Sequence, residues 1–261
     1  MLQAHPVQAF SDNYIWLLEA GAERAFVVDP GDAGPVLLAL AARGLTLAGI
    51  LVTHHHPDHV GGIAQLLSRC GPVPVYGPRG SPASGITQPL DDGDRITVFG
   101  FAADVLAVPG HTLDHIAYFF AAPGAAAPLL FCGDTLFAGG CGRIFEGDPR
   151  MMHASLARLA ALPATTSVYC AHEYTLSNLR FARAVEPQNE QLLRRQLDAE
   201  ALRERGEPTV PSTIALELAT NPFLRCGHTT VRAVAAQRAG MELAGEPEVF
   251  GLVRSWKDDF R

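Results

Sequence analysis

A cluster of histidine and aspartate side chains, Thr53-His-His-His-Pro-Asp-His59, limits what this chain can fold into more than any other segment. It directly follows the apolar run 48–52, whose composition and polar boundaries are typical of a buried β-strand. His54 and His56 are two residues apart, so they would diverge on a helix, whereas a tight turn at Pro57 lets their side chains converge. The sequence therefore predicts a metal-binding loop at the end of a buried strand.

Composition narrows the class of protein. With 261 residues and 48% hydrophobic content, the chain can form one large domain or two smaller ones. The five cysteines form no C-x-x-C pair, which favours reduced thiols. A formal net charge of −7 argues against a nucleic-acid partner. No window approaches about 18 uncharged apolar residues, and the N-terminus lacks the basic and apolar regions of a signal peptide. We expect a cytoplasmic protein without a membrane partner, and a monomer.

Strand and helix signals alternate over the first two thirds of the chain. Apolar runs between Gly, Pro and Asp turns predict strands at 9–18, 25–31, 48–52, 73–76, 96–99, 104–108, 116–120, 129–132 and 168–171. The first two should form a hairpin. Helical spacing and end signals predict helices at 35–44, 63–70 and 148–162, and an Ala/Pro-rich loop lies at 121–128. The fold class is α/β (α+β).

The pattern changes near Glu173. Leu, Gln, Glu and Arg dominate 188–205, and shorter helix candidates with Pro or Gly at their ends follow at 212–219, 230–239 and 247–260. We therefore expect a first domain over residues 1–172 and a C-terminal all-helical domain over 173–261.

Three more candidate ligands follow predicted strands, namely His111, Asp134 and His172. Seven candidates exceed the three or four protein ligands of a single catalytic zinc, and they suffice for two metal ions: His54, His56, Asp58, His59, His111, Asp134 and His172. Asp134 is the natural bridge, since each ion would then have three other ligands. A hydroxide held by two divalent ions forms near neutral pH and attacks electrophilic carbon or phosphorus centres. The two carboxylates of the set, Asp58 and Asp134, are our candidate catalytic residues.

The remaining histidines and the thiols receive structural interpretations. We expect His5, His115, His153 and His228 to form ordinary capping or core hydrogen bonds, and His55 to point away from the metal-binding neighbours. Cys132 and Cys141 lack an activating motif, which favours packing over a nucleophilic role.

The segment 53–62 resembles the T-H-x-H-x-D-H signature of the metallo-β-lactamase superfamily. Further segments resemble glyoxalase II, the hydroxyacylglutathione hydrolase family, and they extend over almost the whole chain: 132–137, 140–147, 172–175, 178–182, 185–187 and 221–225. The resemblance implies an αββα sandwich followed by a helical substrate-binding domain. It also implies hydrolysis of S-D-lactoylglutathione and related 2-hydroxyacyl glutathione thioesters to glutathione and D-lactate by a metal-bridging hydroxide, in methylglyoxal detoxification.

The resemblance also assigns roles to residues. His54, His56 and His111 would hold one metal, Asp58, His59 and His172 the other, and Asp134 would bridge them. Zinc is the first expectation for both ions, and iron and manganese also accept these ligands. Glutathione would be bound by Arg143, Tyr174, Arg254 and Lys257. Arg254 and Lys257 are three apart, so a helix would place both on one face. Phe145 stands where the family commonly has tyrosine, so one hydroxyl contact to the tripeptide is missing.

Other activities occur on the same fold. An iron-dependent persulfide dioxygenase also handles glutathione, but seven ligands and a long helical tail favour a two-metal hydrolase. A di-iron oxygen reductase would need a flavin domain, and a nuclease would need a basic surface. A non-catalytic zinc module would have a saturated tetrahedral site rather than seven ligands.

Overall fold

The protein is described by a computed structural model that covers residues 1–21, 23–121 and 127–260. It forms two compact units. Unit 1 comprises Met1–Ala107 and Asp114–Gly133, and unit 2 comprises Val108–Leu113 and Asp134–Arg261. Most of the predicted loop 121–128 lies outside the described residues. Within the part of the chain that is described, no helix combines the length and apolar character needed to cross a membrane.

Unit 1 contains two β-sheets. The first has the strand order β1-β2-β3-β4-β5-β6, and the second contains β7 to β10 in the order β10-β9-β8-β7. Its strands are β1 Gln3–Ala9, β2 Asn13–Glu19, β3 Arg24–Val28, β4 Thr46–Leu51, β5 Val75–Pro78, β6 Gln88–Leu90, β7 Arg95–Val98, β8 Phe101–Ala107, β9 Ile116–Phe120 and β10 Leu129–Gly133. Its helices are α1 Ala33–Arg43, α2 Pro57–Val60 and α3 Ile63–Cys70.

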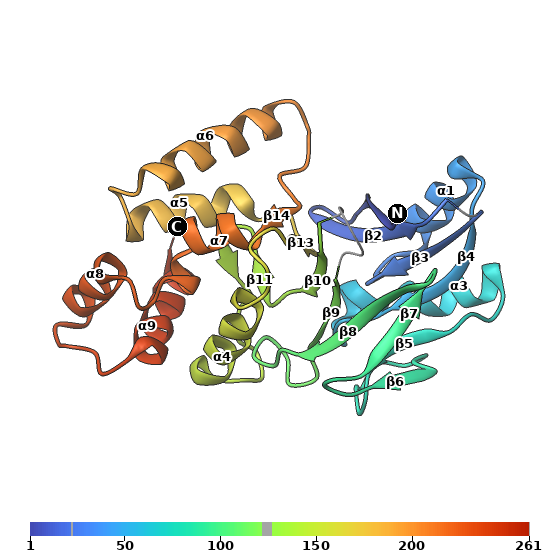
Figure 1. Ribbon diagram of the computed structural model, residues 1–261, viewed down its shortest axis with the longest axis horizontal. Helices are drawn as coiled ribbons and strands as arrows, with labels where there is room; N and C mark the ends of the chain where they lie inside the picture. Colours follow the sequence, from blue (N-terminus) through green and yellow to red (C-terminus); the bar gives the residue numbers. More distant parts are fainter. Residues whose placement is uncertain (22, 122–126, 261) are drawn as a thin grey trace. The chain divides into compact units, whose positions relative to one another are not determined.

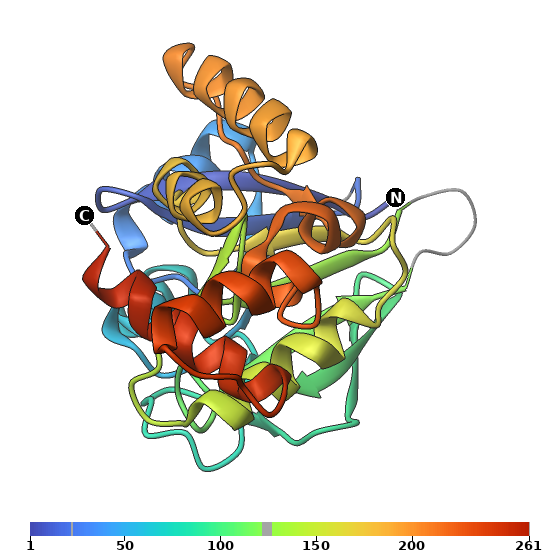
Figure 2. The same ribbon diagram turned by 90° about the vertical axis from the view of Figure 1, so that its left-hand side faces the viewer.

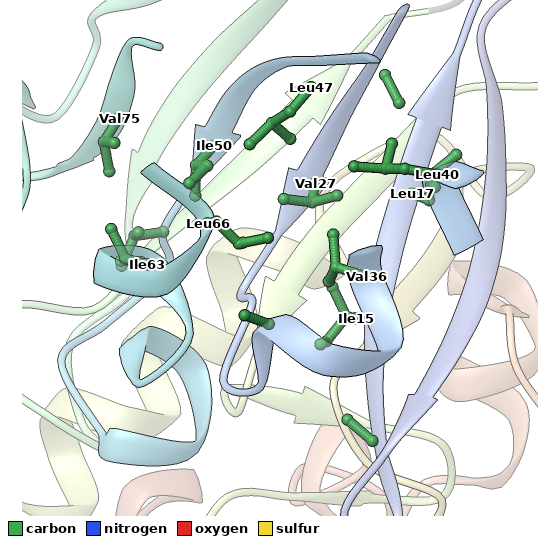
Figure 3. Close-up of a cluster of buried hydrophobic side chains, with 14 residues drawn as sticks. Ile15, Leu17, Val27, Val36, Leu40, Leu47, Ile50, Ile63, Leu66 and Val75 are labelled. Carbon is green, nitrogen blue, oxygen red and sulfur yellow. The ribbon is translucent and has the colours of Figure 1, made fainter. Parts of the chain in front are cut away.

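The core of unit 1 lies between the first sheet and the helices α1 and α3 (Figure 3). Val36 and Leu40 of α1 and Leu66 of α3 point from the helices towards Val27 and Ile50 on the sheet, and all five are buried. On the helices these side chains recur with the helical period. On the sheet they lie in strands that are mostly buried. Burial of such side chains contributes about 1.5–3 kcal/mol each. This packing makes β3 and β4 a rigid base for the loops that follow them.

The strand directions decide where the loops of unit 1 meet. β3 and β4 are parallel neighbours, with Val28 opposite Leu51, and β4 and β5 are also parallel. Parallel neighbours end at the same edge of a sheet, so the residues after β3 and those after β4 lie side by side. The Asp29 amide donates to the Leu51 carbonyl at 2.9 Å. The predicted metal loop therefore begins at the carboxyl edge of the sheet, beside Asp29.

Unit 2 is mainly helical. Its helices are α4 Pro149–Ala160, α5 Thr175–Val185, α6 Glu190–Glu204, α7 Ile214–Thr220, the 3-10 helix η1 Pro222–Leu224, α8 Thr229–Ala239 and α9 Glu246–Asp259 (Figure 1). Its short strands are β11 Leu136–Phe137, β12 Gly140–Cys141, β13 Ser167–Cys170 and β14 Ser212–Thr213. β11 pairs with β12 and β13 with β14, both antiparallel. Helix α9 packs against α4 and α8 (Figure 2).

End signals place several helices within a residue or two of their predicted positions. The Asp148 side chain accepts from the Met151 amide at 2.8 Å and caps α4, with Pro149 as its first residue. Gly44 ends α1 in the left-handed conformation, at φ 64°. The sequence predicted neither β1 nor α5, and it also missed the short elements α2, β6, β11, β12, β14 and η1. Strand β1 contains Pro6 and polar residues, and α5 begins directly after Tyr174 without a side-chain cap that would mark its start in the sequence.

Candidate metal centre

Unit 1 supplies four of the seven candidate ligands from one loop and one short helix. His54 and His56 lie in the loop after β4, and α2 presents Asp58 and His59. Pro57 was expected to turn the chain, and it has a second role. It is the first residue of α2, a position that tolerates proline because its missing N–H would have no helical partner. His54 and His59 are fully buried, and Asp58 is partly exposed.

The spacing of the ligand atoms in unit 1 fits shared metal ions. His54 Nε2 lies 3.2 Å from His56 Nδ1, and Asp58 Oδ2 lies 3.5 Å from His59 Nε2. Two ligand atoms held at about 2.0–2.1 Å by one tetrahedral ion are separated by roughly 3.3–3.4 Å. Both pairs therefore have the spacing of two ligands that share one ion.

Asp29 fixes this loop, although it was not among the site residues predicted from the sequence. Its buried carboxylate accepts from the Thr53 amide and from the Thr53 hydroxyl, both at 2.7 Å, and it lies 3.1 Å from His59 Nδ1. A carboxylate at one imidazole nitrogen fixes the ring's orientation and leaves the other nitrogen for a metal. Asp29 itself has a left-handed backbone, at φ 53°. The Asp-Pro-Gly that directly follows a predicted strand was the available signal.

Two further contacts hold Asp58. The Asn13 side chain donates to Asp58 Oδ2 at 3.0 Å. Gly31 lies so close that an added Cβ would be 1.8 Å from the Asp58 carbonyl oxygen, so only glycine fits there. The 29–31 loop therefore supports both ligands of α2.

Unit 2 supplies the other three ligands from three separate segments. His111 lies in 108–113, Asp134 begins the segment that leads to β11, and His172 follows β13. Asp134 Oδ2 lies 3.4 Å from His111 Nε2 and 3.3 Å from His172 Nε2. One carboxylate oxygen thus faces one nitrogen of each histidine, at the separation expected of atoms that share a metal. All three residues are buried.

The tautomer of His111 follows from its hydrogen bond. His111 Nδ1 lies 2.7 Å from the Arg143 carbonyl oxygen, which can only accept, so Nδ1 carries the proton. The lone pair is then on Nε2, the nitrogen that faces Asp134. The backbone at residue 142 can lie this close to Asp134 because the residue is glycine. An added Cβ would be 1.9 Å from the Asp134 carbonyl oxygen.

An aromatic ring lies against each of the two candidate histidine ligands of unit 2. Tyr174 stacks on His172, with ring centroids 4.7 Å apart and 6° between the planes. Phe145 contacts His111 edge to face at 5.3 Å and is 61% exposed. An exposed aromatic ring beside each histidine gives the site an apolar rim that can accept part of a ligand.

Arg143, Arg254 and Lys257 lie in unit 2 with different partners. Arg254 and Lys257 are in the last turns of α9, as predicted. Arg254 is buried and donates to the Cys141 carbonyl at 3.0 Å, whereas Lys257 is 3.4 Å from the Ser177 carbonyl oxygen. Burial, with Arg254 and Arg180 nearby, lowers the pKa of Lys257 from its usual range. Arg143 is exposed.

The histidines and cysteines set aside from the site have structural contacts. His55 Nδ1 lies 2.9 Å from Asp114, and His115 is buried and stacks on His54 with ring centroids 4.5 Å apart. That support of His54 was not foreseen. Cys132 and Cys141 are buried, and burial raises the pKa of Cys141 to about 11, which disfavours a thiolate.

Comparison with known proteins extends this picture. The family model described as Metallo-beta-lactamase superfamily matches residues 10–172, and the one described as Hydroxyacylglutathione hydrolase C-terminus matches 173–260. Hydroxyacylglutathione hydrolases of Hahella chejuensis and Pseudomonas aeruginosa are 53% and 55% identical over 260 and 262 residues, and each match covers 100% of both chains.

Solved structures are also similar. ETHE1 from Myxococcus xanthus has a TM-score of 0.64 at 24% identity and covers 100% of both chains, which shows the fold alone. TTHA1623 in a di-iron-bound form has a TM-score of 0.53 at 35% identity and covers 64% of this chain and 91% of its own.

The superfamily model spans more than half of the chain, so the protein belongs to the metallo-β-lactamase superfamily. The full-length relatives and the C-terminal model narrow this further: the chain belongs to the hydroxyacylglutathione hydrolase family. The predicted fold class, a metallo-β-lactamase fold followed by a helical C-terminal region, is confirmed.

Proposed function

We propose that this protein hydrolyses S-D-lactoylglutathione and related 2-hydroxyacyl glutathione thioesters to glutathione and D-lactate, in methylglyoxal detoxification. The observation that carries the proposal is identity of more than 50% over the full length to relatives named hydroxyacylglutathione hydrolase. The match of residues 173–260 to the family's C-terminal model favours this activity over the persulfide dioxygenase alternative.

We propose that the seven candidate ligands hold two divalent metal ions. His54, His56 and His111 would bind one ion, Asp58, His59 and His172 the other, and Asp134 both. Four atom pairs separated by 3.2–3.5 Å within the units support the donor set. Histidine and carboxylate ligands suit zinc first, with iron or manganese possible, and TTHA1623 was crystallised in a di-iron-bound form.

Two divalent ions held by these residues would supply a water whose pKa is near neutrality and Lewis-acid polarisation of the thioester carbonyl. The residues of this chain then have defined tasks. Asp29 keeps His59 oriented, and the Arg143 carbonyl keeps the proton of His111 on Nδ1, so both rings present the correct nitrogen. Glutathione leaves as a thiolate whose conjugate acid has a pKa of about 8.5, so little general-acid assistance is needed.

Substrate binding is assigned to Arg143, Tyr174, Arg254 and Lys257. Glutathione has two carboxylates, which cations bind through charge-assisted hydrogen bonds. Tyr174 is partly exposed and can contact the peptide. Phe145 offers a ring without a hydroxyl, so we expect weaker polar discrimination there.

We further propose that residues 1–172 form the catalytic domain and 173–261 the substrate-binding domain, a division supported by family models that meet at this boundary. Cysteines in the thiol form support a reducing, cytoplasmic compartment. The protein should be a monomer, which light scattering will check.

The function is tested by thiol release from S-D-lactoylglutathione and from the lactoyl thioester of N-acetylcysteamine. The acyl groups are identical, so the difference between the two rates of thiol release measures recognition of the glutathione moiety. We expect rapid release from the glutathione thioester alone. Release from neither, with oxygen consumption on glutathione persulfide, would replace the proposal with the dioxygenase.

A further inference from the structure

Asp258 joins two of the candidate substrate-binding arginines. Its Oδ1 atom lies 3.3 Å from Arg143 Nε and 3.1 Å from Arg254 Nη2. Arg254 is one helical turn back on α9, whereas Arg143 comes from the segment after β12. One carboxylate oxygen thus connects a helix with the segment whose carbonyl holds His111.

The two arginines differ in how firmly they are held. The Arg254 side chain is 8% exposed, donates also to the Cys141 carbonyl, and lies 5.1 Å from the Phe223 ring centroid. The Arg143 side chain is 59% exposed, and among the described residues its one ion-pair partner is Asp258. An exposed arginine loses side-chain rotamer entropy when it binds a ligand. Contact with a carboxylate that is itself fixed by Arg254 removes part of that cost beforehand.

The position of Asp258 is unfavourable for the helix alone. It lies in the last turn of α9, which ends at Asp259, where the negative end of the helix dipole repels carboxylates. A carboxylate at this end of a helix destabilises the helix. Asp258 therefore stands where a helix disfavours a carboxylate, and it contacts two arginines. This combination indicates that its role lies outside the helix.

We propose that Asp258 is a positioning residue that holds the Arg143 guanidinium ready to bind a carboxylate of the glutathione moiety. This inference rests on the proposed function. Asp258 Oδ1 lies 3.3 Å from Arg143 Nε, and a substrate carboxylate would form its bidentate pair with the terminal nitrogens of the same guanidinium. Arg254 fixes Asp258 from the buried side.

Charge alone predicts the opposite effect. A carboxylate near an anion site repels the substrate, so its removal would strengthen binding if Asp258 acted only through its field. Asp259 supplies the matched control, because it lies in the same turn and is exposed. Asp259→Asn changes the net charge by the same amount without touching Arg143.

The experiment compares the KM and kcat for S-D-lactoylglutathione in Asp258→Asn and Asp259→Asn. We expect Asp258→Asn to raise KM about five- to tenfold with kcat within about twofold, and Asp259→Asn to leave both nearly unchanged. Asp258→Glu should restore part of the loss. A KM that is unchanged or lower in Asp258→Asn would overturn the proposal.

A double-mutant comparison identifies the route of the effect. If Asp258 acts through Arg143, Asp258→Asn should raise KM no further in an Arg143→Ala background. Full additivity would contradict the proposal. The thermal midpoint of each variant separates this effect from unfolding, and a poorly folded Asp258→Asn is replaced by Asp258→Glu, whose longer side chain should displace Arg143 and still raise KM modestly.

Calorimetric binding of glutathione separates this inference from the proposed function. If the wild type binds glutathione but does not hydrolyse the thioester, the function is wrong and the Kd ratio of the Asp258→Asn and wild-type proteins still tests the positioning role. If the wild type neither hydrolyses nor binds, both proposals fail.

Discussion

The two units hold their candidate ligands in different ways. Unit 1 places four of them between His54 and His59, directly after a buried strand, and supports them through Asp29 on the neighbouring strand's loop. Unit 2 gathers His111, Asp134 and His172 from three segments, and these ligands meet at one oxygen of Asp134. Loss of a support in unit 1 should therefore weaken the site, whereas loss of the shared carboxylate in unit 2 should abolish it.

The largest expected effect follows from Asp134→Asn. The amide keeps the shape of the side chain but removes the charge that would face both ions, so we expect bound metal and thioester turnover to fall together, with kcat/KM lower by at least about a thousandfold. Elemental analysis and thiol-release assays measure the two quantities. Asp148→Asn is the control, because asparagine also caps α4. Wild-type turnover in a metal-depleted Asp134→Asn protein would contradict the shared role.

A smaller effect is expected from Asp29→Asn in unit 1. Asparagine tolerates the left-handed backbone of residue 29, so the substitution isolates the carboxylate. Loss of such a partner of a metal-binding histidine lowers metal affinity or activity by about 10- to 100-fold. Competition with a chelator measures the affinity, and Asp32→Asn, which preserves the cap of α1, is the control. An effect as large as that of Asp134→Asn would contradict the expectation that loss of a support in unit 1 is milder than loss of the shared carboxylate in unit 2.

The pH dependence of substrate binding should reveal Lys257. Burial and the neighbouring arginines lower its pKa, so the amine loses its proton at a lower pH than an exposed lysine does. KM for the anionic substrate should therefore rise, by severalfold, as pH increases through this pKa, below the usual value of 10.5. In Lys257→Arg the charge persists, and the alkaline rise should disappear. An identical pH profile in both proteins would exclude Lys257 from the binding site.

The smallest effect concerns the thiols. Cys70 in unit 1 is exposed, whereas Cys141 and Cys170 in unit 2 are buried with pKa values raised to about 11 and about 12. Maleimide at pH 7.5 should label one thiol in the native protein and five after unfolding, with turnover unchanged by the native label. Rapid labelling of Cys141 together with loss of turnover would indicate a reactive thiol.

The sequence revealed the parts of the site that are local. His54 to His59 are adjacent in the chain, and the apolar run before them marks the strand that places them. Asp29, Asn13 and His115 could not be identified in the same way, because they reach the ligands through strand pairing and ring stacking between distant residues. The same holds for Asp258, whose partner Arg143 is far away in the chain. Helix ends were predicted well because caps are local, whereas strand β1 lacked the expected apolar pattern.

The most direct test of the central claim, that the seven candidate ligands bind two metal ions for thioester hydrolysis, is a zinc titration of the metal-free protein with turnover of S-D-lactoylglutathione measured at each point. We predict that turnover rises until two zinc ions are bound per chain and that Asp134→Asn fails to reach this plateau. Full turnover with a single bound ion, or two bound ions without thioester hydrolysis, would contradict it.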